Sequence, residues 1–300
     1  MLTSHSTEAE DAKFGIAPSR LVAQRDLDTP VIAPGSWHAD AVKDFTERLG
    51  RDDFPCLFAR RAWNSCSILF LFCGRDEAGG YRDFLAGLTE FTRFVKDTAL
   101  ADRLFSPLVV FFETDVEHVA DQHAIGWDAL NWVHERDPAP WPSGISRSPD
   151  DPDWCFCFNG VQLFVNMSST AHTVLRSRNL GARLTFVINP RENFDAVASI
   201  HTKSGRLVRD RIRSRVAAYN DGAVPEELGF YGEEGNREWK QYQLEEAGLP
   251  RPATCPFRAA REDASRPYDL AARRRAAVRI DPAPRPDAGS ATDPKSQTGT

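Results

Sequence analysis

The chain has 300 residues and a formal net charge of −6, and 41% of its residues are hydrophobic and 10% aromatic. This composition supports a substantial core in one large domain or two small ones, and the acidic balance argues against nucleic acid as the main partner. No apolar run approaches the roughly 20 residues that cross a bilayer, and the start "MLTSHSTEAEDAKF" lacks the regions of a signal peptide, so we expect a cytoplasmic protein without a membrane anchor.

The first half of the chain alternates helical and strand patterns. Val42, Phe45 and Leu49 recur at helical spacing in residues 37–50, and Gly50 predicts the end of this helix. Because Pro55 disfavours helix in the residue before it, "FPCLFARRAW" is predicted to be extended or a turn. The remaining patterns predict buried strands over 65–73 and 106–113 and long helices over 79–99 and 115–137.

A β-hairpin is predicted in "DWCFCFNGVQLFVNM", where two apolar stretches flank Asn159 and Gly160. Asn-Gly between such runs is a strong hairpin signal because both residues tolerate the backbone of a tight turn. A further strand is predicted over 182–190, ended by Pro190, and a basic helix over 206–221. Residues 226–250 predict a loop followed by a short helix.

The two ends of the chain differ in composition from the middle. Residues 259–300 are rich in Ala, Arg, Pro, Asp and Ser, which predicts a disordered tail, and residues 1–21 predict a flexible arm. Residues 22–258 would then form a single catalytic α+β domain. The order of the elements predicts a mixed or largely antiparallel sheet with helices packed on it.

His172, in "AHTVLRSRN" after the hairpin, is the first candidate for chemistry. It is either a histidine hydrogen-bonded to backbone or a metal or haem ligand, since imidazole is a common axial ligand of haem iron. If the segment after Ser169 is helical, Arg176 lies one turn past His172 on the same face. Arg176 and Arg178 form either a solvated basic patch or a cationic pair for haem propionates or a substrate carboxylate.

Cys56 is the second candidate. The six cysteines form no CxxC pair, so we expect reduced thiols, most of them buried as small apolar groups. Cys56 is either such an inert thiol or a thiolate ligand of haem iron, which suits oxygen insertion because it donates electron density.

Two acidic segments carry the remaining candidates. Asp195 follows a predicted strand together with Arg191, and it is either a helix cap or a binding carboxylate. The second segment contains acids and aromatic residues that belong either to a solvated loop or to a site that holds a guanidinium: Tyr231, Glu233, Glu234, Glu238 and Trp239. Glycine-rich phosphate loops and the common hydrolase, metalloprotease and kinase motifs are absent from the sequence.

Several separated blocks in a fixed order resemble the YqcI/YcgG family, from about Pro30 to Phe257. The blocks are "FPCLFARRAW", "GWDALNWVHERDP", "WCFCFNGVQLFVNMSSTAHTVLRSRNLG", "TFVINPRENFD", "RDRIRSRVAAYND", "ELGFYGEEGNREWKQYQL" and "CPF". The characterised branch of this family implies a haem-dependent monooxygenase that hydroxylates guanidino compounds, here L-arginine to Nω-hydroxy-L-arginine in D-cycloserine-type antibiotic biosynthesis. A related guanidine as substrate, or a haem carrier or sensor without turnover, is the alternative.

The resemblance does not identify the residue that holds the iron, so the roles of the candidates are assigned from their own chemistry. Haem b iron would be held by His172, with Cys56 as the alternative, and its propionates by Arg176, Arg178 or Arg191. Asp195, Glu233 and Glu234 are the candidates for the substrate guanidinium. The oxidant would be peroxide, or dioxygen with an electron donor.

Overall fold

The computed structural model describes residues 19–28, 32–75, 80–114, 116–246 and 248–258. The predicted tail over 259–300 and most of the predicted arm over 1–21 lie outside these residues. Across the described ranges, every helix is too short or too polar to span a membrane.

The strands of the described residues form one sheet in the order β1-β2-β3-β6-β5-β4. Among these described strands, β2 and β3 run parallel, with Phe70 opposite Val109, and the other neighbours are antiparallel. The prediction of a mixed, largely antiparallel α+β sheet is therefore confirmed. The strands are β1 (Val22–Ala23), β2 (Leu69–Cys73), β3 (Leu108–Phe112), β4 (Phe156–Phe158), β5 (Val161–Ser168) and β6 (Leu184–Pro190).

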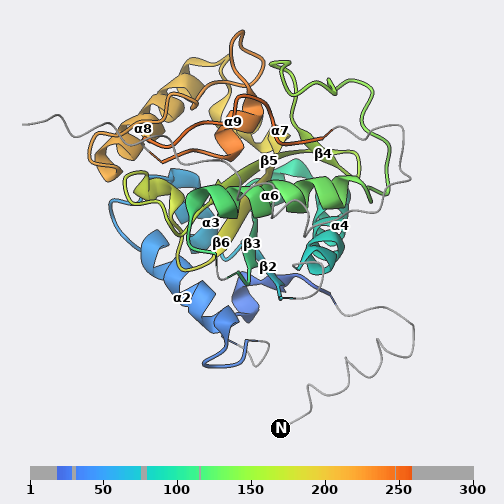
Figure 1. The fold of residues 1–300 in the computed structure, drawn as a ribbon, viewed down its shortest axis with the longest axis vertical. Coiled ribbons are helices and arrows are strands. Elements are labelled where there is room, and N and C mark those ends of the chain that lie inside the picture. The colour runs from blue at the N-terminus through green and yellow to red at the C-terminus, as the bar shows by residue number, and fades with distance from the viewer. Residues whose placement is uncertain (1–18, 29–31, 76–79, 115, 247, 259–300) are drawn as a thin grey trace, which may run out of the picture. The chain divides into compact units, whose positions relative to one another are not determined.

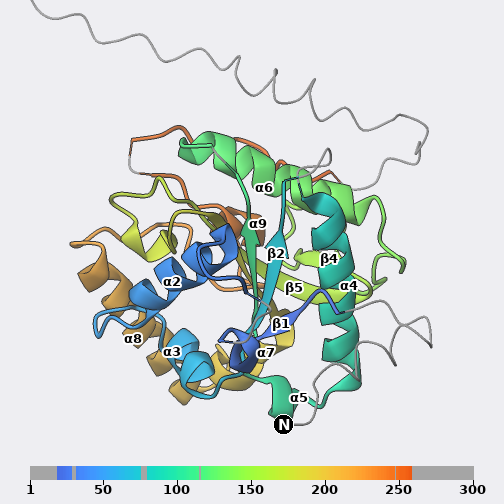
Figure 2. The ribbon, with the colours of Figure 1, turned by 90° about the horizontal axis from the view of Figure 1, so that it is seen from below.

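One face of the sheet is covered by two long helices, α4 (Tyr81–Asp97) and α6 (Val119–His134) (Figures 1 and 2). Phe84 of α4 makes edge-on ring contacts with Phe112 and Phe186 of the sheet, and all three rings are buried. Such aromatic pairs add to the free energy of burying the rings themselves. This face is a closed core.

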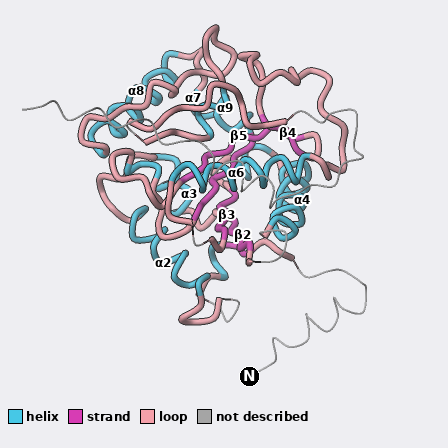
Figure 3. The backbone as a smooth tube through the Cα atoms, in the orientation of Figure 1, coloured by secondary structure: helices cyan, strands magenta, loops and turns pink. Residues whose placement is uncertain are grey.

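The opposite face carries the helices that shape the candidate site, and Figure 2 shows α2, α3 and α8 on the side of the sheet away from α4. Phe45 of α2 packs on Phe70 and Phe111 of the sheet. Before β2, the chain forms α2 (Trp37–Leu49) and α3 (Leu57–Asn64). After β6, it forms α7 (Arg191–Ala198), α8 (Lys203–Tyr219) and α9 (Glu238–Tyr242), and Figure 3 shows that the chain after α8 is mostly loop. The short helix α5 (Leu100–Arg103) precedes β3.

The side chains of strand β5 show that the two faces of the sheet differ in how completely they are buried. Leu163, Val165 and Met167 are fully buried toward the α4 and α6 layer, whereas the alternating Phe164 and Asn166 are only half-buried. Because successive side chains of a strand point to opposite faces, the second face must be incompletely filled. The candidate site lies in that space.

The hairpin is confirmed at the predicted turn. Asn159 and Gly160 both have positive φ, 50° and 73°, as a type I′ turn requires. The hairpin forms one edge of the larger sheet, because β5 also pairs with β6.

Two local predictions were wrong, and one helix was not predicted. Residues 57–64 form helix α3, because Pro55 restricts only the residue before it and Cys56 then caps a run of good helix formers. Pro190 ends β6 as predicted, and helix α7, which was not predicted, begins at once with Arg191. The segment after Ser169 is not helical until the 3-10 turn η3 (Arg176–Arg178), so Arg176 does not share a helix face with His172.

Candidate functional site

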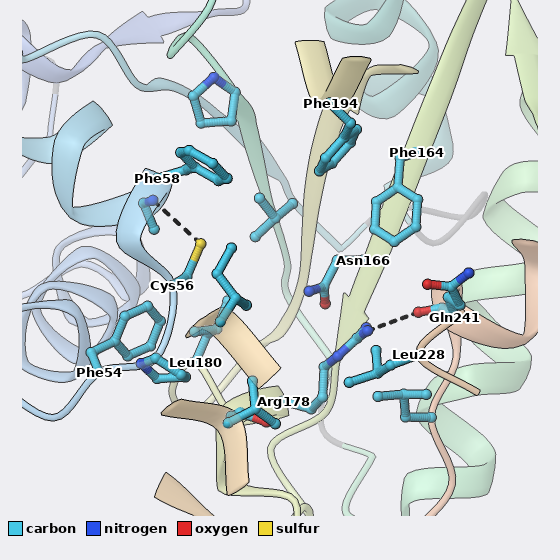
Figure 4. A pocket seen from close by; sticks show the side chains of 18 of the residues that line it. Phe54, Cys56, Phe58, Phe164, Asn166, Arg178, Leu180, Phe194, Leu228 and Gln241 are labelled. Atoms are coloured by element: carbon cyan, nitrogen blue, oxygen red, sulfur yellow. Dashed lines mark hydrogen bonds between the residues drawn. The ribbon is translucent and has the colours of Figure 1, made fainter. Parts of the chain in front are cut away.

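An apolar cavity of about 290 Å³ lies between the second face of the sheet and its helices. Its lining includes Val109, Phe164 and Val187 of the sheet and Phe58 and Phe194 of the helices. Figure 4 shows Phe194 beside Phe164, with Phe58 across the cavity from Phe164. The volume of the cavity is at the lower end of the range for cofactor and small-molecule sites, which are also mostly apolar.

Cys56 borders this cavity and an adjoining one of about 100 Å³. It is the N-cap of α3, and its Sγ accepts a hydrogen bond from the Ala59 N–H at 3.4 Å. Arg215 of α8 fixes the preceding turn by donating to the carbonyls of Phe54 and Pro55. Burial raises the pKa of the Cys56 thiol, so the sulfur is protonated, but its N–H donor and the helix N-terminus are features that stabilise a thiolate.

Arg178 points into the apolar cavity (Figure 4). It is 6% exposed, and its guanidinium donates to the backbone carbonyls of Gln241 at 2.8 Å and Tyr242 at 3.4 Å. Burial lowers the pKa of Arg178 to about 10, so it stays charged at neutral pH. A buried guanidinium bonded only to carbonyls retains its attraction for an anion.

Two further arginines, Arg209 and Arg213 of α8, line the same cavity. They lie one helical turn apart, and they donate to the carbonyls of Ala198 and Leu228. None of the described residues that line this cavity is acidic. Its rim therefore suits the carboxylates of a bound molecule.

A second, polar cavity of about 470 Å³ lies beside the first. On β5, Gln162 lines the polar cavity and Phe164 the apolar one; on α7, Arg191 and Asp195 line the polar cavity and Phe194 the apolar one. Residues two apart on a strand share a face, so the two cavities adjoin one another along β5. Lys96, Arg103, Glu192 and Tyr231 complete the charged and aromatic part of the polar lining.

His172 lies apart from the described lining of the apolar cavity. Its Nδ1 is 2.6 Å from Glu246 Oε2, and the same carboxylate accepts backbone N–H groups of Val174 and Leu175. Burial lowers the pKa of His172 to about 4, so the imidazole is neutral and donates to an ionised Glu246. Its Nε2 has no hydrogen-bond partner within the described chain, and the ring of His123 lies 5.8 Å away between centroids.

The structure separates the remaining candidates. Arg176 is outside the apolar lining and braces the end of α8 by donating to the Tyr219 carbonyl and to Asp221. Glu233 and Glu234 are exposed on a loop and belong to neither cavity lining. Thus Cys56 and Arg178 come together at one cavity, and Arg191 and Asp195 at the other.

Sequence reasoning missed several residues of the site. Arg209 and Arg213 were visible only as part of a basic helix, although their i, i+4 spacing indicates a shared face. The sequence named Glu238 together with Glu233 and Glu234, but it could not show that Glu238 is buried, at 2% exposed, while the other two are solvated. No local pattern identified Glu246 as the partner of His172, since the two are 74 residues apart.

Residues 45–258 match the model of the YqcI/YcgG family. The chain belongs to this family. The matched span includes every described residue that lines the apolar and polar cavities, and the resemblance predicted from the sequence is confirmed.

Three YqcI/YcgG relatives cover most of the chain. "Putative N(omega)-hydroxy-L-arginine synthase DcsA" of Streptomyces lavendulae is 42% identical over 80% of this chain and 89% of its own. The uncharacterized proteins YqcI and YcgG of Bacillus subtilis (strain 168) are 31% and 32% identical, over 80% and 74% of this chain and 94% and 88% of theirs. No solved structure gives a significant match.

Proposed function

We propose that this chain is an oxygenase that hydroxylates the guanidino nitrogen of L-arginine and releases Nω-hydroxy-L-arginine. The support for this substrate is the name of the Streptomyces relative and its 42% identity over most of both chains. One oxygen atom enters an N–H bond in this reaction. With hydrogen peroxide the other oxygen leaves as water; with dioxygen, a donor must supply two electrons and two protons for that water.

We also propose that haem b is the cofactor and that the apolar cavity holds it. The donor set fits this group: apolar walls, one thiol with an N–H donor, and arginines whose hydrogen bonds go to carbonyls. This combination at one cavity is the geometric observation that carries the proposal. When bound, haem iron supplies the activation of the oxidant, which a thiolate ligand favours by donating electron density.

Of the two predicted axial ligands, we propose Cys56. Its Sγ borders the cavity, and iron would replace the thiol proton. His172 has two features of a metal ligand, a carboxylate on Nδ1 and an Nε2 without a partner among the described residues, but it does not belong to the described cavity lining. His172 is therefore the alternative.

The other side chains have binding roles. Arg178, Arg209 and Arg213 would pair with the propionates, since a cationic rim without acids attracts carboxylates. The phenylalanines exclude water, which strengthens the electrostatic interactions in the cavity. Of the acids predicted to hold the guanidinium, only Asp195 lines a described cavity.

The proposal is tested with the full chain supplied with haem. We expect a Soret band, a change of this band on adding L-arginine, and hydroxyarginine by mass spectrometry with peroxide or with dioxygen and a reductant. Protein that stays colourless would contradict the haem proposal. Coloured protein without product under either oxidant would instead indicate a haem carrier or sensor. If another guanidine is hydroxylated and L-arginine is not, the substrate assignment is wrong. The role in antibiotic biosynthesis stays a prediction.

A further inference from the structure

Arg191 lies in surroundings suited to binding a guanidinium. Its Nε is 3.5 Å from Glu238 Oε1 and its Nη1 is 3.8 Å from Asp195 Oδ1. The guanidinium carbon lies 4.2 Å from the centre of the Tyr231 ring, and the Tyr231 hydroxyl is fixed by donating to the Asp153 carbonyl at 2.6 Å. Carboxylates beside the guanidinium and an aromatic ring on its face are the contacts that guanidinium groups prefer.

The ion pair of Arg191 with Glu238 is longer than a normal charge-assisted hydrogen bond. Arg191 and Glu238 are 6% and 2% exposed, yet neither Arg191 Nε nor Glu238 Oε1 has a hydrogen-bond partner among the described residues. A charge-assisted pair normally closes to about 2.7–2.9 Å. Burial raises the pKa of Glu238 to about 7, although Arg191 and Arg209 oppose the shift. A buried carboxylate with an unused acceptor favours a better-placed cation.

Glu238 lines neither cavity itself, but its neighbours line both. Its partner Arg191 lines the polar cavity, while Gln241, three residues further on α9 and thus on the same helix side, lines the apolar one. A guanidinium at Glu238 would therefore be next to the cavity that we assign to haem.

The polar cavity can hold the rest of an amino acid. At about 470 Å³ it has the volume of a small-molecule site, and its lining carries both signs of charge. Lys96 and Arg103 are cationic, and Glu192 and Asp195 are anionic. The ammonium and carboxylate groups of a bound amino acid need an anionic and a cationic partner, respectively.

We propose that Glu238 and Tyr231 form the guanidinium subsite of the substrate, and that in this structure Arg191 occupies it in the substrate's place. The substrate's guanidinium displaces that of Arg191, which then pairs with the substrate carboxylate in the polar cavity. The exchange of one guanidinium for another leaves the charge of the subsite unchanged. This inference rests on the proposed guanidino substrate, but its tests need no turnover.

The first test replaces the side chain of Arg191 with a free guanidinium ion. In Arg191→Ala, about 20 mM guanidinium chloride should raise Tm by roughly 2 °C or more over equal potassium chloride, and it is too dilute to denature. Wild type, the double variant Arg191→Ala/Glu238→Gln and the control Arg206→Ala, an exposed arginine on α8, should show no such gain. Equal gains in the single and double variants, or none in the single variant, would overturn the proposal. If Arg191→Ala fails to fold, Arg191→Gln retains most of the side-chain volume and is used in the same way.

The second test measures L-arginine binding to the full chain by calorimetry. Glu238→Gln should raise Kd about tenfold or more because it removes a charge-assisted contact, while the exposed control Glu47→Gln should leave Kd unchanged. L-citrulline, whose ureido group is neutral, should bind to neither Glu238→Gln nor Glu47→Gln. Unchanged arginine affinity in Glu238→Gln would refute the subsite even if hydroxyarginine is formed. Lost affinity would support it even if wild type forms no product.

Discussion

Cys56 Sγ accepts a hydrogen bond from the Ala59 N–H at 3.4 Å, which places the sulfur at the start of α3 and at the wall of the apolar cavity. One residue thus has both a structural role and the proposed role of iron ligand. The N-cap satisfies an N–H that the helix itself leaves free, and the same N–H would stabilise a thiolate. Any test of ligation must separate the two roles.

Cys56→Ser should abolish most of the haem absorbance while keeping the fold, because serine caps a helix well but is a poor ligand for haem iron. His172→Ala should retain the Soret band. Haem titration monitored by absorption, with far-ultraviolet circular dichroism as the control for folding, checks both variants. A retained band in Cys56→Ser and a lost one in His172→Ala would assign the iron to the imidazole.

Arg178→Ala should weaken haem binding about tenfold or more, because it removes a buried cation from the rim of the cavity. Arg178→Lys should recover part of that affinity. Arg176→Ala is the matched comparison: its guanidinium braces α8 outside the cavity, so it should lower the free energy of unfolding by about 1 kcal/mol without changing the haem affinity. Equal haem affinities of the two alanine variants would contradict these assignments.

The stability of the protein should fall on acidification in a way that depends on His172. Burial lowers the pKa of His172 to about 4, whereas an unfolded imidazole titrates near pH 6.5, so protons favour the unfolded chain between these values. From about pH 7 to pH 5, the free energy of unfolding should drop about 2 kcal/mol more in wild type than in His172→Gln. Urea unfolding at both pH values measures the difference. Parallel losses in the two proteins would show that His172 is not held neutral.

L-arginine should bind more tightly as the pH rises through 7. Burial raises the pKa of Glu238 to about 7, and only its ionised form attracts a guanidinium. Kd should rise up to about tenfold for each pH unit below 7 and level off above it. The raised pKa also means that Glu238 stabilises the fold below its unfolded pKa, and that this contribution is lost as the pH rises through 7. Calorimetry from about pH 6 to pH 8 checks the first trend, and a flat profile would argue against Glu238 as the binding carboxylate.

The sequence by itself determined the local elements whose signals lie in neighbouring residues. The periodic apolar faces of α4 and α6 and the Asn159-Gly160 turn all appear as predicted. These patterns are readable because a helix face or a two-residue turn is defined within a few positions. Helices α3 and α7 were missed because each begins within two residues after a proline, and a proline marks a boundary without specifying the conformation of the residues after it.

Only the tertiary structure decided which candidates meet. Cys56, Arg178 and Phe194 line one cavity although they come from distant parts of the chain, and Glu233 is separated from the site although Glu238, five residues on, is buried beside it. Sequence spacing could suggest His172 and Arg176 as a pair, but the loop between them is held by Glu246 and turns them apart. Burial and long-range pairing set the charge state and the partner of each side chain, and both depend on the whole fold.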